Sequence, residues 1–399
     1  MKVLLAPDTS DHQNWGCRVM GAAFRSALSA NGASAVWRIP SRWFYRDDPE
    51  LANLVRMADI RALGERVARG QALRELSLSL RACDLVFFNG ENFLRRGTTK
   101  GRRLMLLAYL AKVVFGKPCV MSNISLEMDE PELAEIVREV LPLMDEVHVH
   151  EEISVQHAGA MFQPPRWQRI PDIAWASPAA PLEQWAGLGH RSGHFSAWPD
   201  SADGFDPRQP YVTVCATSAH SMADAATPAL VASYATLCRR LQAEVAPVVL
   251  AAPDESDLVL LRKVQAAASV PLLGTHLPVQ QAVDVIGNAR VHVGGRWHLG
   301  IFAASGGTPQ VALRANSHKM EGLMDQLGDG GPVFEPNQLD SHIEAIVGLA
   351  KRHASAGQAR VSASLFERGH WLPPCRRTWP TCGAWSGGSD AGRSRRPSR

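Results

Sequence analysis

One stretch of the sequence decides the fold, and it reads Val291-His292-Val293-Gly294-Gly295-Arg296-Trp297-His298-Leu299-Gly300-Ile301-Phe302-Ala303-Ala304. The apolar run at its start predicts a β-strand, the glycine pair a tight turn, and the small apolar residues at its end a helix. In open α/β sheets, ligands bind where a strand ends and a helix begins, because the free N–H groups of the helix N-terminus attract anions. The stretch therefore predicts a ligand site at a strand–helix junction.

Two side chains at this junction, Arg296 and His298, suit an acidic substrate. A guanidinium group binds a carboxylate or a phosphate through two parallel hydrogen bonds. Imidazole is the side chain best suited to proton transfer near neutral pH. We predict that Arg296 holds an anion, that His298 donates a proton, and that Gly295 lets the backbone approach the ligand. A helix cap with a simple ion pair is the alternative interpretation of the same residues.

Length and composition indicate a globular protein of two domains. The 399 residues exceed what one hydrophobic core usually serves, and 46% apolar with 20% charged residues is an ordinary globular composition. We recognise no signal peptide and no apolar run of membrane-spanning length, so we expect no integral membrane segment, with peripheral attachment left open. Seven scattered cysteines form neither a disulfide framework nor a zinc pattern, which favours a cytoplasmic location.

The net charge of +3 is concentrated in one segment. Residues 371–399 hold six arginines and one aspartate, a net charge of +5, so the residues before them carry −2. This near-neutral body has no basic stripe, and we expect no nucleic acid as a partner. The segment 371–399 lacks apolar periodicity, and we predict a disordered basic tail without a catalytic role. The sequence leaves the oligomeric state open.

Strands alternate with helices through the first half of the chain, and polar residues follow the strands. Apolar runs at 2–6, 35–39, 84–88, 118–124 and 146–150 predict strands. The loop after the first run has neither a G-x-G-x-x-G pattern nor a P-loop lysine, which excludes both nucleotide fingerprints. The candidate binding residues that follow these strands are Asn14, Gly16, Asn89, Gly90, Glu91 and His150.

The same alternation restarts at residue 211, with strands predicted at 211–216, 245–251, 270–274 and 291–294. Thr217 and Ser218 follow the first of these strands and are further candidate binding residues. The pattern predicts an α/β fold of two Rossmann-like, doubly wound domains that face a cleft, as in the GT-B architecture. The predicted boundaries are 1–176 for the N-terminal domain, 177–210 for a linker, 211–370 for the C-terminal domain and 371–399 for the tail.

Two further clusters bear on the chemistry. His148 and His150 lie two residues apart with the spacing of metal ligands, but no third ligand is identifiable, so we assign no metal. A basic cluster begins at Arg95 and suits an acidic or phosphorylated acceptor, although a solvated helix face is the more usual meaning of such a run. Its members are Arg95, Arg96, Lys100, Arg102 and Arg103.

The order of these motifs resembles the polysaccharide pyruvyl transferase family. The resemblance is carried by the Arg-x-His junction at 296–298, the turn Gly307-Thr308-Pro309, the lysine-bearing segment from His318, and the turns at 14–16 and 89–91. Three positions depart from the family pattern: Cys17 follows Gly16 where an acidic residue is commoner, Asn92 replaces a glycine, and His150 replaces an arginine.

The resemblance implies transfer of a pyruvyl group from phosphoenolpyruvate to a hydroxyl pair of a sugar, glycolipid or polysaccharide precursor, giving a pyruvate ketal without cofactor or metal. It implies that His298 is the general acid, that Arg296 clamps the donor, and that Lys319 is a second cationic contact. The C-terminal domain would bind the donor. The acceptor would lie along the N-terminal domain, against Asn14, Gly16, Asn89 and Glu91.

Two alternatives remain open from the sequence. In a GT-B glycosyltransferase, Arg296 and Lys319 would hold a nucleotide diphosphate and Glu321 would bind the ribose hydroxyls. A non-catalytic sugar-binding protein is the second alternative, because His150 and Asn92 depart from the family pattern.

Overall fold

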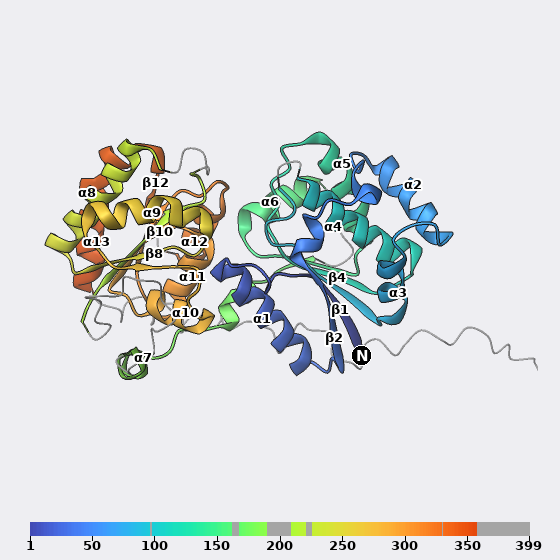
Figure 1. The fold of residues 1–399 in the computed structure, drawn as a ribbon, viewed down its shortest axis with the longest axis horizontal. Coiled ribbons are helices and arrows are strands. Elements are labelled where there is room, and N and C mark those ends of the chain that lie inside the picture. Colours follow the sequence, from blue (N-terminus) through green and yellow to red (C-terminus); the bar gives the residue numbers. More distant parts are fainter. Residues whose placement is uncertain (96–97, 162–166, 190–208, 221–225, 329, 357–399) are drawn as a thin grey trace, which may run out of the picture.

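The computed structural model describes residues 1–95, 98–161, 167–189, 209–220, 226–328 and 330–356. These residues form two parallel six-stranded sheets, each in its own half of the molecule, with helices on their faces (Figure 1). The predicted α/β class and the two Rossmann-like domains are confirmed. The predicted tail lies outside the described residues.

The first sheet has the strand order β2-β1-β3-β4-β5-β6, and its neighbouring strands all pair in parallel. Its strands are β1 (Lys2–Asp8), β2 (Ala35–Pro40), β3 (Leu85–Asn89), β4 (Cys119–Ile124), β5 (Glu146–Val149) and β6 (Trp167–Arg169). Its helices are α1 (Trp15–Ala30), α2 (Met57–Ala68), α3 (Arg74–Ala82), α4 (Thr99–Tyr109), α5 (Pro131–Val140) and α6 (Glu152–Met161). Strands β3, β4 and β5 are buried along their whole length, because helices cover both faces of the sheet.

The second sheet has the strand order β12-β11-β10-β7-β8-β9. Its strands are β7 (Val212–Thr217), β8 (Val248–Ala251), β9 (Leu272–Leu273), β10 (Val291–Gly295), β11 (Gln310–Leu313) and β12 (Val333–Phe334). Its helices are α8 (Pro228–Glu244), α9 (Glu255–Ala268), α10 (Val279–Gly287), α11 (Trp297–Ser305), α12 (Lys319–Leu327) and α13 (Leu339–Ala356). The stretch 291–304 is therefore β10 and most of α11, as predicted. The glycine pair expected to form a turn lies within β10, and Arg296 alone separates the strand from the helix.

The strand order reverses between β1 and β3 in one sheet and between β7 and β10 in the other. At such a switch point the loops after the two strands diverge to opposite faces and leave a crevice for ligands. Both switch points are therefore places where a ligand site is expected.

The segment predicted as a linker is docked against the second domain. It contains helix α7 (Leu182–Gly189), whose Trp185 is fully buried. Backbone groups of Ala180 bond to Asp284 at 2.8 Å and to Asn288 at 2.9 Å, at the end of α10. Composition alone does not indicate this helix, because its burial rests on the tertiary contacts of Trp185. Residues 190–208 lie outside the described residues.

A single apolar cluster, here called the inter-domain core, extends from one domain into the other. Helix α1 contributes Trp15 and Phe24 to it, and α11 contributes Ile301. Figure 1 shows α1 lying between the two halves of the molecule. The N–H group of Trp15 donates to Pro253 O across the interface at 3.0 Å. The first helix of the N-terminal domain is thus also part of the packing of the second.

No helix in the described ranges combines the length and the apolar character needed to cross a membrane.

Candidate active site

A cavity of about 240 Å³ lies between the domains, beside both switch points. Seven of the predicted site residues line it: Asn14, Gly16, Glu91, Ser218, Arg296, His298 and Lys319. They come from loops after four different strands and from the starts of α1, α11 and α12. The site is therefore shared by the two domains.

Arg296 immediately precedes α11 and is held by helix α9. Its Nε and Nη2 donate to Asp257 Oδ1 at 3.1 and 2.8 Å, and Nη2 also donates to Ser256 Oγ at 3.0 Å. Burial raises the pKa of Asp257 to about 6, although Arg296 acts in the opposite direction, so this carboxylate is ionised at neutral pH. Among the described residues Nη1 has no partner, and it is the part of the guanidinium left to bind a ligand in the cavity.

His298 lies in the first turn of α11, with Nε2 3.5 Å from Asp172 Oδ2. The same carboxylate oxygen accepts hydrogen bonds from Trp297 Nε1 at 3.0 Å and Asn123 Nδ2 at 3.1 Å. Burial raises the pKa of Asp172, but the charge of His298 and the hydrogen bond to it outweigh burial and keep that pKa below its usual value. A buried, ionised carboxylate therefore lies beside the imidazole of His298.

Gly16 is required for this geometry. A Cβ atom added to Gly16 would lie 2.2 Å from His298 Nδ1, so only glycine lets α1 approach the ring this closely. Gly16 and His298 both line the cavity.

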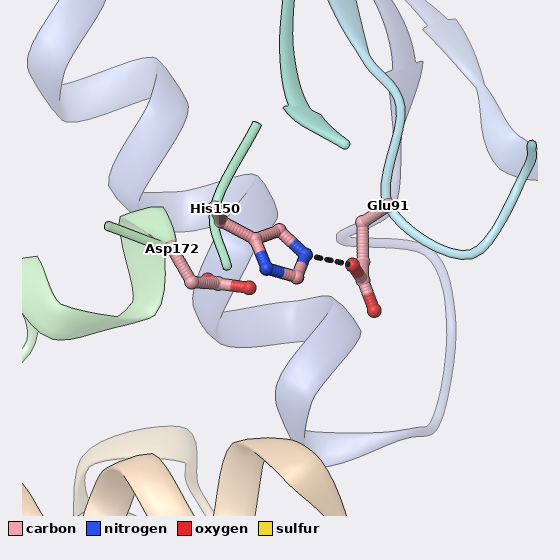
Figure 2. Close-up of side chains that lie close together, drawn as sticks. All are labelled: Glu91, His150 and Asp172. Carbon is pink, nitrogen blue, oxygen red and sulfur yellow. Dashed lines mark hydrogen bonds and ion pairs between the residues drawn. The ribbon is translucent and has the colours of Figure 1, made fainter. Parts of the chain in front are cut away.

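The buried imidazole of His150 lies between the carboxylates of Glu91 and Asp172 (Figure 2). His150 Nε2 lies 3.1 Å from Glu91 Oε2 and 3.0 Å from Ser125 Oγ. Its ring stacks on Trp297, with centroids 5.0 Å apart and an interplanar angle of 28°. His150 does not line the cavity itself, but it packs against Trp297, which does.

Glu91, His150 and Asp172 each offer one ligand atom within 4.8 Å of the others, which is close enough to hold a metal ion. The carboxylates are already bonded, however. Glu91 pairs with the Lys319 ammonium, and Asp172 accepts from Asn123 and Trp297. We therefore assign no metal to this cluster. The pairing of His148 with His150 suggested by their spacing does not occur, because His148 bonds to Ser122 and Glu146 instead.

The ion pair between Glu91 and Lys319 joins the two domains, and both side chains are buried. Burial raises the pKa of Glu91, but Lys319 and His150 outweigh burial and hold that pKa well below its usual range. Since Glu91 neutralises Lys319, this lysine is a weak ligand for an anion.

Five predicted site residues lie behind the cavity wall and do not contact the cavity: Asn89, Gly90, His150, Thr217 and Gly295. Asn89 Oδ1 accepts the N–H group of Glu91 at 3.2 Å and so fixes the loop that carries Glu91. Thr217 Oγ1 donates to the carbonyl of Arg314. A Cβ on Gly295 would lie 2.4 Å from Thr217 Oγ1. These residues shape the loops instead of facing a ligand.

Several residues that line the cavity were missed as binding residues by sequence reasoning. They are Thr9, His12, Tyr45, Asn92, Asp254, Asn316 and Ser317, while Arg95 and Lys100 were noted only as members of the basic cluster. Asn316 and Ser317 follow β11, so the strand-end rule that found Ser218 could have found them. Tyr45 follows a short 3₁₀ turn at 41–44, and no pattern in the sequence marks it.

Two helices begin at the cavity with uncapped N-termini. No side chain caps α11 or α12, and residues at the start of each line the cavity. Ser317 Oγ, two residues before the start of α12, is buried without a partner among the described residues. Free N–H groups at the positive end of a helix dipole favour an anion, so the wall formed by the C-terminal domain is suited to negative groups.

Two departures from the family pattern are accommodated by the structure. Asn92 has a φ of 59°, the left-handed conformation that glycine adopts most easily and asparagine tolerates. Burial raises the pKa of the Cys17 thiol to about 12, so this cysteine is not a nucleophile.

Two Rossmann-like domains with a ligand cavity between them define the GT-B-like class of proteins. The UDP-GlcNAc 2-epimerase from Methanocaldococcus jannaschii matches with a TM-score of 0.53 and 10% identity, over 92% of this chain and 100% of that chain. The UDP-GlcNAc 2-epimerase from Neisseria meningitidis, solved bound to UDP-GlcNAc, matches with a TM-score of 0.52 and 12% identity, over 92% and 99% of the two chains. At such low identity these likenesses show the fold alone.

Comparison of the sequence with family models identifies the family within this class. The family model described as polysaccharide pyruvyl transferase matches residues 22–317. This is most of the chain, which therefore belongs to the polysaccharide pyruvyl transferase family, and the resemblance drawn from its motifs is confirmed. No curated protein matches the chain.

Proposed function

We propose that this protein transfers the pyruvyl group of phosphoenolpyruvate to a pair of hydroxyls on a sugar, forming a pyruvate ketal. The observation that carries the proposal is the pairing of His298 with the buried Asp172 at the edge of a cavity whose C-terminal wall is suited to anions. A proton donor beside an anion site is what protonation of an enol phosphate requires.

The donor has a carboxylate and a phosphate, and the C-terminal wall offers partners for both. Nη1 of Arg296 and the N-terminus of α11 would bind one group. The N-terminus of α12, with the hydroxyl of Ser317, would bind the other. This places the methylene carbon of the donor near His298, which lies at the start of α11.

In the first step, the imidazolium of His298 gives its proton to the methylene carbon. The electron pair of the carbon–carbon double bond forms the new C–H bond, and C2 becomes an oxocarbenium-like centre. A sugar hydroxyl adds to C2 and its proton returns to the neutral imidazole of His298. The imidazolium of His298 then protonates the bridging oxygen, and phosphate leaves with the C–O electron pair. A second hydroxyl of the same sugar adds to C2 and closes the ketal, and its proton passes to the neutral imidazole of His298. The ionised carboxylate of Asp172 stabilises each protonated state of the histidine.

The structure offers less support for the alternatives. A nucleotide-sugar donor would use Glu321 for the ribose hydroxyls, but Glu321 pairs with Arg314 Nε at 3.2 Å and does not line the cavity. A non-catalytic role was suggested by Asn92 and His150, but Asn92 adopts the backbone conformation that a glycine would adopt there, and His150 is bonded to Glu91.

The proposal is tested by thermal-shift titration with phosphoenolpyruvate and with a panel of nucleotide sugars. A ligand that binds only the folded state raises the melting temperature by mass action. We expect a shift with phosphoenolpyruvate that is lost in Arg296→Ala and reduced in Arg296→Lys, which keeps a charge beside Asp257 and so guards against simple unfolding. A shift with nucleotide sugars and none with phosphoenolpyruvate would overturn the proposal.

A further inference from the structure

The cationic side chains around the cavity differ in how far they are neutralised. Those that line it are Arg95, Lys100, Arg296 and Lys319. Arg296 is bonded to Asp257, and Lys319 is paired with Glu91. Arg95 donates to Asn316 at 2.8 Å and lies 4.0 Å from Glu127. Lys100 has no carboxylate within ion-pair distance in the described part of the chain, so its charge is available to a ligand.

Within the described ranges, the Lys100 ammonium lies against aromatic rings and is not paired with a carboxylate. Lys100 lies in the first turn of α4, a helix capped by Thr98, and its Nζ is 5.2 Å from the ring centroid of Phe93 and 5.9 Å from that of Tyr45. Cation–π contacts of this kind orient an ammonium group without neutralising it. Tyr45 is 54% exposed although it lines the cavity, so one part of its ring is open to a ligand. An aromatic face of this kind suits the apolar face of a sugar.

Lys100 belongs to the wall formed by the N-terminal domain, whereas the anion-binding groups proposed for the donor all belong to the C-terminal domain. The two negative groups of phosphoenolpyruvate are matched by Arg296 and the two helix N-termini. The charge of Lys100 is therefore not needed for phosphoenolpyruvate and is available to the acceptor.

We infer that Lys100 binds a phosphate group of the acceptor, and that the acceptor is a phosphorylated sugar whose ring lies against Tyr45. The inference rests on the proposed function only in calling this ligand the acceptor; the binding site itself does not depend on it. A phosphate monoester accepts a charge-assisted hydrogen bond from the ammonium, with Arg95 nearby as a second positive charge.

Burial, Arg95 and Lys319 lower the pKa of Lys100 to about 8, against the opposite effect of Cys17 and Glu91. The phosphate should therefore bind more weakly as the pH rises through 8, where the ammonium loses its proton. The neighbouring Tyr45 and Cys17 have pKa values raised to about 12, and the pKa of Glu91 lies well below its usual range, so none of these three titrates there.

The experiment measures binding of hexose 1-phosphates (glucose, galactose and mannose 1-phosphate), the matching free hexoses and phosphoenolpyruvate by calorimetry. The proteins are the wild type, Lys100→Met, Lys100→Arg, and Lys263→Met as a control that removes one exposed lysine far from the cavity. We expect a hexose 1-phosphate to bind the wild type at pH 7, with affinity about tenfold lower in Lys100→Met, since a hydrogen bond between charged groups is lost. Lys100→Arg and Lys263→Met should keep the affinity. Phosphoenolpyruvate should bind Lys100→Met nearly as well as it binds the wild type.

The outcomes separate this inference from the proposed function. Hexose phosphate binding that depends on Lys100, without phosphoenolpyruvate binding, would keep the inference and sink the proposed function. If Lys100→Met weakens phosphoenolpyruvate and leaves the hexose phosphates unchanged, the lysine serves the donor and the inference is wrong. Equal affinity for a hexose and its 1-phosphate, or no binding of any hexose phosphate, would also overturn it.

Discussion

Gly16 shows how a residue without a side chain can control the position of a histidine ring in the cavity. Its α-carbon lies so close to His298 that the ring occupies the volume of a Cβ atom. The sequence marked Gly16 as a binding residue because it follows a strand in a polar loop. Its position in the structure gives it a second role, which is to leave room for the imidazole.

Gly16→Ala tests this role. A methyl group 2.2 Å from His298 Nδ1 would push the ring away from Asp172, and we expect turnover to fall about a hundredfold, the usual contribution of a positioned acid. Gly159→Ala in α6 is the matched control, because a Cβ there meets nothing within 4 Å. Steady-state kinetics would measure the turnover of both variants, and melts followed by circular dichroism would show that both are folded. Unchanged turnover in Gly16→Ala would show that the ring position is not critical.

Asp172 is the second residue that acts through its closeness to His298, since its Oδ2 lies 3.5 Å from Nε2 of that ring. Asp172→Asn keeps an oxygen that can accept from Trp297 and removes the negative charge beside His298. We expect kcat to fall about a hundredfold, while phosphoenolpyruvate binding changes little. A loss of phosphoenolpyruvate binding or a lower melting temperature together with the fall in kcat would indicate a structural role for Asp172 instead.

At the scale of elements, strand β10 leads directly into the cavity residues and also contains a buried titratable group, His292. Its Gly295 end delivers Arg296 and His298 to the cavity, whereas His292 in its middle is buried against Thr213 Oγ1 at 3.0 Å. Burial lowers the pKa of His292 to about 3, so the folded protein keeps this ring neutral.

This pKa shift predicts acid sensitivity. Between pH 6.5 and 3 the unfolded chain binds a proton at His292 that the folded chain does not, so the free energy of unfolding falls as the pH is lowered. The slope from this one group is at most about 1.4 kcal/mol per pH unit. We expect melting temperatures measured from pH 7 to pH 4 to fall less steeply in His292→Asn than in the wild type. The exposed His276, changed to Asn, should leave the slope as it was.

Element prediction succeeded where the pattern was long and failed where it was short. The runs that became β4 and β7 are buried throughout, and their unbroken apolar sequence predicted them. Strand β12 was missed because two residues, Val333 and Phe334, give no period. Helix α7 was missed because its burial depends on Trp185 meeting the second domain, which is a tertiary contact.

The site was partly predictable for the same reason. Arg296 and His298 follow a recognisable strand, so their convergence on the cavity could be expected. The partners Asp257 and Asp172 come from other elements, and nothing local links them to the junction. Sequence reasoning therefore found Arg296 and His298 as cavity residues and missed the carboxylates that lie beside them.

At the scale of the whole molecule, buried polar contacts connect the domains around the cavity. Lys319 pairs with Glu91, and His318 lies 3.1 Å from Glu151 across the same interface. Burial raises the pKa of Glu151, but His318, His150 and Ser154 outweigh burial and lower it to about 2. These contacts fix the relative position of the two walls of the site.

A double-mutant cycle on Glu91 and Lys319 measures this connection. Lys319→Met leaves a buried carboxylate with less compensation, and we expect about 3 kcal/mol of destabilisation. The double variant Glu91→Gln with Lys319→Met should recover much of this loss, because no unpaired charge remains. Urea denaturation of the four proteins gives the coupling free energy. Additive effects of the two substitutions would show that the pair does not connect the domains.

The inter-domain core also limits how such proteins can be recombined. By sequence, α1 belongs to the first half of the chain, yet Trp15 and Phe24 share their buried surroundings with α10 and α11. A chimera that joins the halves of two relatives within 177–210 would preserve both sheets and still place α1 against foreign side chains. Exchange of α1 together with the C-terminal half would restore a matched interface. The halves of this fold are therefore not interchangeable modules, and new specificities would arise more readily by substitutions within one chain than by exchange of domains.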